Sequence, residues 1–157
     1  MRRVLALAVV AVAAALACGP GGSSTPTPVA STPLAGTYNG SPWTAQKGRA
    51  KAWPVGDGGE RWLDVASAAL PCSSFGGDPQ LIGTIPWQTG VAVDFGLQEN
   101  LTFVVDDGSG TPMNYVATNG RLEVISAPDA GTGVVRIRAK YNDQFSVEGE
   151  VQLDVCD

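Results

Sequence analysis

The chain has 157 residues and a formal net charge of −5, and it contains no histidine. The lack of histidine excludes Ser-His-Asp and Cys-His nucleophilic catalysis and every histidine-ligated metal site. The acidic balance, with no cluster of Lys or Arg to offset it, argues against binding to nucleic acid.

The first residues have the form of a secretory signal. Arg2 and Arg3 follow the initial methionine, and residues 4–17 are all Val, Leu or Ala. A transmembrane helix needs about 20 apolar residues, and the run Gly19-Pro20-Gly21-Gly22 ends this segment too early. We therefore expect residues 1–17 to be a signal peptide that exports the protein.

Cys18, directly after the apolar run, has two interpretations. Small residues at Ala15 and Ala17 fit ordinary signal cleavage, which would release a soluble protein. The same run, Ala15-Leu16-Ala17-Cys18, resembles the lipobox of bacterial lipoproteins, with Ala15 in the place where leucine is usual. That resemblance implies acylation (palmitate) of Cys18 and a membrane anchor. By similarity to sorted lipoproteins, Gly19 after the cysteine implies the outer membrane if the cell has two membranes.

The number of cysteines favours the lipoprotein interpretation. There are three, Cys18, Cys72 and Cys156, and an odd thiol in an exported protein calls for an explanation. If Cys18 carries lipid, Cys72 and Cys156 are left to form a disulfide in an oxidising compartment. Neither belongs to a C-x-x-C pair, so we expect this bond to be structural.

Residues 18–34 are expected to form the lipidated cysteine and a flexible linker, because Gly, Pro, Ser and Thr dominate and no charge is present. Residues 35–157 then make one β domain. Loss of Arg2 and Arg3 with the signal leaves eight basic against fifteen acidic residues, a net charge near −7.

Short alternating apolar runs, separated by Gly, Asn, Asp and Pro, predict an all-β fold for this domain. We expect an antiparallel β-sandwich of about 8–9 strands, with a small β-barrel as the alternative. An Asn39-Gly40 turn is predicted to join a strand near residues 37–38 to a longer strand, 42–53, with a bulge at Gly48. Residues 61–67 and 80–85 are predicted to form two further strands.

Three hairpins are predicted in the second half of the chain. The first pairs residues 91–97 with 101–105, and the second turns at Asn119-Gly120. The last pairs residues 135–141 with 145–155 across a three-residue loop, which keeps both apolar sets on one face. The predicted register matches are Phe95 with Phe103, Val93 with Val105, Ala117 with Leu122, Tyr115 with Val124, Tyr141 with Phe145, Arg138 with Glu148, and Arg136 with Glu150.

No residue set carries a recognisable catalytic or metal motif, and no cofactor is expected. Four tryptophans remain, Trp43, Trp53, Trp62 and Trp87, and burial in the core is the usual fate of such residues. If exposed, Trp62 and Trp87 would offer a platform for stacking sugars or for a protein partner. Carboxylates for glycoside hydrolysis are also present, although alternation places most of them on solvated faces: Asp94, Glu99, Asp106, Asp107, Glu123, Glu148 and Glu150.

The whole pattern resembles small uncharacterised bacterial lipoproteins that open their domain with N-G-x-x-W, here from Asn39 to Trp43, and end on a β-hairpin. The resemblance implies a β-sandwich on a lipid anchor and brings no known activity. We expect a non-catalytic β domain at the cell envelope in a binding or structural role, with an envelope protein or glycan as partner. The alternative is a carbohydrate-binding module or a glycan-acting enzyme.

Overall fold

The computed structural model describes residues 26–52, 59–73, 79–106 and 108–157, so Cys18, Trp53 and Asp107 lie outside the described residues. In these ranges the chain forms eleven β-strands, and no helix there is long and apolar enough to cross a membrane. The strands are β1 (Ala35–Tyr38), β2 (Ser41–Thr44), β3 (Lys47–Ala52), β4 (Glu60–Ala66), β5 (Gln80–Pro86), β6 (Ala92–Asp94), β7 (Leu101–Asp106), β8 (Pro112–Ala117), β9 (Asn119–Ser126), β10 (Thr132–Asn142) and β11 (Phe145–Cys156).

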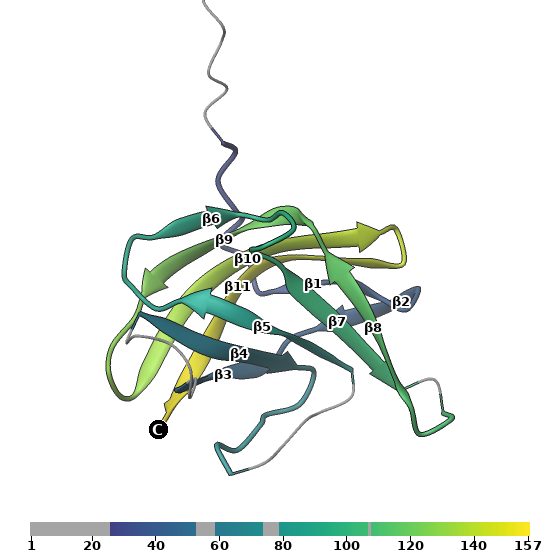
Figure 1. The fold of residues 1–157 in the computed structure, drawn as a ribbon, viewed down its shortest axis with the longest axis horizontal. Helices are drawn as coiled ribbons and strands as arrows, with labels where there is room; N and C mark the ends of the chain where they lie inside the picture. Colours follow the sequence, from purple (N-terminus) through teal and green to yellow (C-terminus); the bar gives the residue numbers. More distant parts are fainter. Residues whose placement is uncertain (1–25, 53–58, 74–78, 107) are drawn as a thin grey trace, which may run out of the picture.

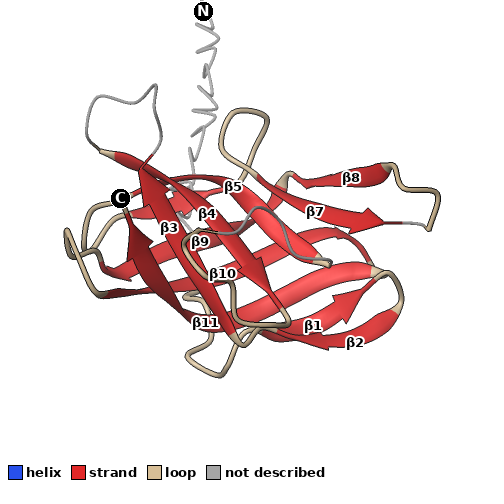
Figure 2. Ribbon diagram, turned by 90° about the horizontal axis from the view of Figure 1, so that it is seen from below, coloured by secondary structure: helices blue, strands red, loops and turns tan. Residues whose placement is uncertain are grey.

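All eleven strands belong to one hydrogen-bonded sheet with the order β6-β9-β10-β11-β3-β4-β5-β7-β8, and β1 and β2 extend it beside β11. The sheet curls so that its two halves face each other (Figures 1 and 2). The all-β prediction is confirmed. Two separate sheets are not seen, and the eleven strands exceed the 8–9 expected.

Strand β11 joins the two halves. One of its edges pairs with β10, and the other pairs first with β1 and then with β3. The β11–β3 pairing is parallel, with Leu153 opposite Gly48 and Cys156 opposite Lys51. A purely antiparallel sheet was therefore the wrong expectation, and the sheet is mixed.

The core lies between the facing halves, and Tyr38 is at its centre. Its ring packs 5.2 Å from that of Phe103 and 5.6 Å from that of Phe145, so β1, β7 and β11 meet there. Its hydroxyl donates to the carbonyl oxygens of Gln80 and Val104 and accepts the Val104 N–H. These bonds satisfy backbone groups that β5 and β7 would otherwise bury unpaired.

Two predicted hairpins are wrong. Strand β6 pairs with β9 rather than β7, and β8 pairs with β7 rather than β9. Asn119-Gly120 begins β9 instead of making a turn. Gly120 has φ +148°, and a Cβ there would come 1.9 Å from the carbonyl oxygen of Arg138. The glycine is needed for close contact between β9 and β10, a role that resembles a turn signal in the sequence.

The last hairpin has the predicted charge register, with Arg136 opposite Glu150 and Arg138 opposite Glu148. Its turn differs, because the register shifts after Lys140 and Asn142 pairs with Phe145. The Asn142 side-chain oxygen accepts the N–H groups of Gln144 and Phe145. This side-chain turn shortens the loop and leaves Tyr141 without the predicted partner.

At the first hairpin, the turn is confirmed: Asn39 and Gly40 have φ +50° and +74°, and Tyr38 pairs with Ser41. The long strand expected after it is divided into β2 and β3. The bulge at Gly48 is wrong, since a Cβ there would lie 2.5 Å from Leu153 and 2.7 Å from Val65, so this glycine allows close core packing. The strands predicted at 61–67 and 80–85 are present as β4 and β5.

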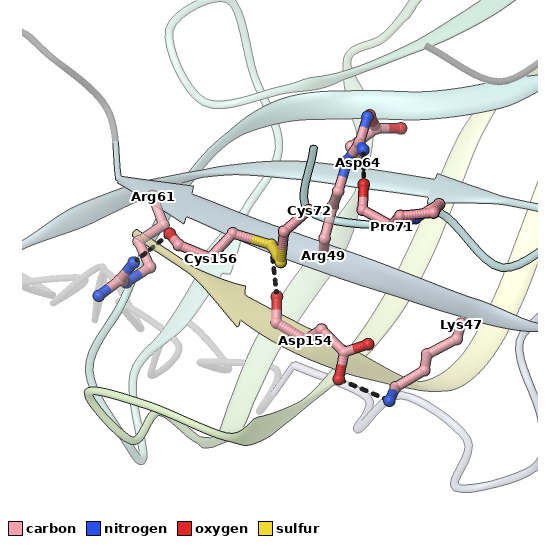
Figure 3. The surroundings of a disulfide bond; sticks show 8 residues. All are labelled: Lys47, Arg49, Arg61, Asp64, Pro71, Cys72, Asp154 and Cys156. Carbon is pink, nitrogen blue, oxygen red and sulfur yellow. Dashed lines mark hydrogen bonds and ion pairs between the residues drawn. A yellow bond between two sulfur atoms is a disulfide. The ribbon is translucent and has the colours of Figure 1, made fainter. Parts of the chain in front are cut away.

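Cys72 and Cys156 form a disulfide, in agreement with the expected pairing (Figure 3). The bond ties the end of β11 to the loop after β4. A buried ion pair holds the same loop, because Arg49 binds Asp64 through Nη2 at 2.5 Å and donates through Nη1 to the carbonyl of Pro71 at 2.6 Å. Both side chains of the pair are almost wholly buried, so the loop is fixed covalently and by charge.

Part of the segment expected to be a flexible linker is ordered. Residues 26–34, here called the N-terminal strap, lie on the outer face of β9, β10 and β11. Val29 is 3% exposed and Leu34 is 1% exposed. The Val29 and Ala30 N–H groups bind the carboxylates of Glu123 and Glu148. The folded unit therefore begins at or before residue 26, not at residue 35.

Removal of the disulfide should destabilise the domain strongly. The two cysteines are 84 residues apart, and closing such a loop stabilises by about 4.5 kcal/mol in the chain-entropy model. Urea unfolding of the Cys72→Ala/Cys156→Ala variant should therefore show a loss of that order. Equal midpoints for this variant and the wild type, or two free thiols in the native protein, would contradict the assignment.

Acid should weaken the contact between Glu148 and the strap. A hydrogen bond from Arg138, opposed by partial burial and aided by the Ala30 N–H, holds the pKa of Glu148 below its usual value. The stabilisation from this group is present above the ordinary glutamate pKa and is lost as the pH falls through the lowered one. Unfolding of the wild type and Glu148→Gln between pH 7 and pH 3 should show a difference that shrinks with acid. A constant difference would refute this.

Candidate functional site

The two tryptophans proposed as a platform do not come together. Trp62 stands opposite Thr84 on the face of β4 and β5 that points away from the core. Trp87 continues β5 with the opposite side-chain direction and packs against the core. Alternation along the strands therefore places the two indoles on opposite faces of this part of the sheet, and a joint Trp62–Trp87 platform is wrong.

Trp87 has a structural role. Its Nε1 donates to the carbonyl of Pro128 at 2.9 Å, and its ring lies where a Cβ on Gly133 would come within 2.4 Å. The guanidinium of Arg61 lies 5.8 Å from the ring centroid, close enough for a cation–π contact. Trp87 thus joins β4 to the loop between β9 and β10. Trp43, 6% exposed, also belongs to the core.

Trp62 instead lines an open groove of about 380 Å³. The groove arises because β5 pairs with β7 only from Gln80 to Ile82. Beyond Ile82, the rest of β5 faces the turn at residues 96–100 rather than a strand. That turn is held by the Gly96 N–H, which donates to the Glu99 carbonyl at 2.7 Å, and by the Asn100 side chain, which donates to the Leu97 carbonyl.

The side chains of this groove combine one aromatic ring with many hydrogen-bonding groups. The Trp62 groove is lined by Glu60, Trp62, Ile82, Gly83, Thr84, Gln98, Glu99, Asn100 and Thr102. Two amides, two hydroxyls and two carboxylates can donate to or accept from a polar ligand. No described Lys or Arg lines the groove, so an anionic ligand would meet only like charge.

Gly83 helps to form the groove floor. A Cβ at this position would lie 2.6 Å from the Leu101 side chain and 2.9 Å from the Asn100 carbonyl oxygen. The missing side chain lets the 96–100 turn approach β5 closely. The volume lies within the usual range of small-molecule sites, so the groove has room for a ligand of one or two sugar rings.

Most of the other carboxylates considered for catalysis are bound to arginines. Arg121 contacts both Asp94 and Glu123, while Arg138 contacts Glu148 and Arg136 contacts Glu150. The hydrogen bonds from Asp94 and Glu123 raise the pKa of Arg121. Asp106 caps its own turn by accepting the Gly108 N–H. Of the carboxylates named from the sequence, only Glu99 lines the Trp62 groove in the part of the chain that the structure describes.

Sequence reasoning found Trp62 and Glu99 but missed their neighbours in the groove. Glu60, Thr84, Gln98, Asn100 and Thr102 come from separate segments, and no local motif connects them. Within the described ranges, no group of three or more acidic or cysteine side chains is placed to hold a metal ion.

Comparison with known proteins adds no functional assignment: no family model matches the chain, and no significant match was found among curated proteins or solved structures.

Proposed function

We propose that the protein is a lipid-anchored binding protein of the cell envelope, and that the Trp62 groove takes a neutral saccharide. The observation that carries the binding role is the composition of the groove, an indole ring surrounded by amide, hydroxyl and carboxylate groups without a cation. Saccharides present C–H faces that stack on an aromatic ring and hydroxyls that need such polar partners.

The envelope location rests on the sequence. The Arg2-Arg3 start, the apolar run to Ala17 and the lipobox-like segment before Cys18 support export and acylation. The Cys72–Cys156 disulfide accords with an oxidising compartment and leaves Cys18 as the remaining thiol for a lipid. Two or three acyl chains, at about 0.8 kcal/mol per buried methylene, would anchor the domain stably.

Loss of the indole should weaken saccharide binding. Titration of the mature protein with neutral oligosaccharides, such as cello- and chito-oligomers and uncharged cell-wall glycan fragments, should quench tryptophan fluorescence. Trp62→Ala should bind about tenfold more weakly, since stacking contributes roughly 1.4 kcal/mol. Trp62→Phe should retain part of the affinity.

Tyr141→Ala is the matched control, because Tyr141 is a partly exposed aromatic residue on another part of the surface. Its affinity should equal that of the wild type, with binding measured by calorimetry for every variant. Equal affinity of Trp62→Ala and wild type, or no binding by the wild type to any of these glycans, would overturn the groove assignment.

The anchor is tested by the intact mass of the protein purified from the membrane fraction of its own cells. We expect a chain that begins at Cys18 and carries the additional mass of its acyl chains. The Cys18→Ala variant should lose both the added mass and the membrane association. A mature wild-type chain without acyl groups would contradict the lipoprotein assignment while leaving the groove untouched.

A further inference from the structure

The N-terminal strap occupies a seat built for it on the outer face of β9, β10 and β11. Thr32 accepts the Glu150 N–H at 2.6 Å, and the Leu34 N–H binds the Glu150 carbonyl at 2.9 Å. Beside these bonds, Gly149 adopts φ +142°, and a Cβ there would lie 2.5 Å from the Thr32 oxygen and 2.6 Å from the Pro33 oxygen. A glycine at this strand position therefore makes room for the strap.

Charged side chains hold the other end of the strap. Arg138 donates to the carbonyls of Thr27 and Pro28 at 3.3 and 2.8 Å while it binds Glu148 at 2.7 Å. Glu148 in turn accepts the Ala30 N–H. Hydrogen bonds with one ionised partner are about twice as strong as neutral ones, so this pair compensates for the low intrinsic tendency of the strap sequence to order.

The strap shortens the connection between the domain and Cys18. If the chain were free up to Leu34, the sixteen residue steps from Cys18 would reach about 58 Å when fully extended. With the strap seated, only the eight steps from Cys18 to Pro26 remain, which reach about 29 Å at most. The seated strap thus halves the reach and determines which face the tether leaves.

The Trp62 groove is on the other side of the molecule. The strap covers the outer face of the β9–β11 half, and the groove opens on the outer face of the β4–β7 half, with the core between them. Figure 1 shows the strap, in purple, leaving beside β6 and β9, whereas β3 and β4 lie at the opposite side.

We propose that the seated strap orients the domain on a lipid surface, with the outer face of β9 and β10 toward the membrane and the Trp62 groove facing away from it. This inference rests on the proposed anchoring through Cys18. The orientation comes from the tether and not from attraction to lipid headgroups, because the arginines on this face are paired with Glu123, Glu148 and Glu150 and the domain as a whole is acidic.

Seating of the strap is tested without lipid by hydrogen exchange of the Val29 and Ala30 amides in the mature chain. Arg138→Ala should speed this exchange at least tenfold, and Val29→Asp should do the same through the buried valine. Arg136→Ala is the matched control, since its residue forms the neighbouring ladder pair with Glu150 and makes no hydrogen bond to the strap in the described part of the chain. Equal exchange in Arg138→Ala and Arg136→Ala would overturn the seating.

Orientation is tested by energy transfer to an acceptor-labelled lipid in uncharged phosphatidylcholine vesicles. The chain beginning at Cys18 is coupled through that thiol to a maleimide phospholipid, so the result does not depend on acylation in the cell. A donor dye is attached through an alkyne-bearing amino acid at Asn119, beside the strap, or at Gln98, in the groove.

Transfer from position 119 should exceed transfer from position 98, and the difference should persist at high salt. Arg138→Ala should reduce the difference, and Arg136→Ala should keep it. Equal transfer from the two positions in the wild-type sequence would refute the orientation, whereas an intact mass without acyl groups would refute only the natural anchor.

Discussion

The arrangement of the molecule depends on one edge of β11. Twelve residues long, this strand pairs along that edge with β1 over its first four residues and with β3 over its last four. The first pairing places the strap and the β1–β2 hairpin, and the second places the whole β3–β8 half. Without the parallel β3 pairing the two halves would share only side-chain contacts, so backbone hydrogen bonds set how they face each other.

The disulfide and the buried Arg49–Asp64 pair act at the end of that edge. Cys156 ends β11 and is bonded to Cys72, while Arg49 in β3 reaches both Asp64 in β4 and the carbonyl of Pro71. Breaking such a buried pair by removing one partner leaves an uncompensated charge, a cost of roughly 3–5 kcal/mol. Covalent and ionic contacts thus fix β3, β4 and β11 together, and the groove-forming strands continue from β4.

The sequence predicts what alternation and nearest-neighbour charge determine. The register of the last hairpin follows from Arg136 and Arg138 facing acidic partners, and the first turn follows from Asn39-Gly40. Pairing between β6 and β9, or β8 and β7 alone, cannot be read locally, because it depends on which distant strand is available. Glycines mislead most: Gly48 and Gly120 resemble a bulge and a turn, but close packing requires them.

The candidate site and the strap were hidden for related reasons. Trp62 and Thr84 become neighbours only through strand pairing, and Gln98 joins them only because β5 outlasts its pairing with β7. A Gly-, Pro- and Thr-rich segment predicts disorder from composition, yet the strap is ordered by partners more than a hundred residues away, Arg138 and Glu148. One outer face is therefore neutralised and partly covered by the chain's own N-terminal segment. The opposite face keeps an open groove, and a tether attached to the first face leaves the second exposed.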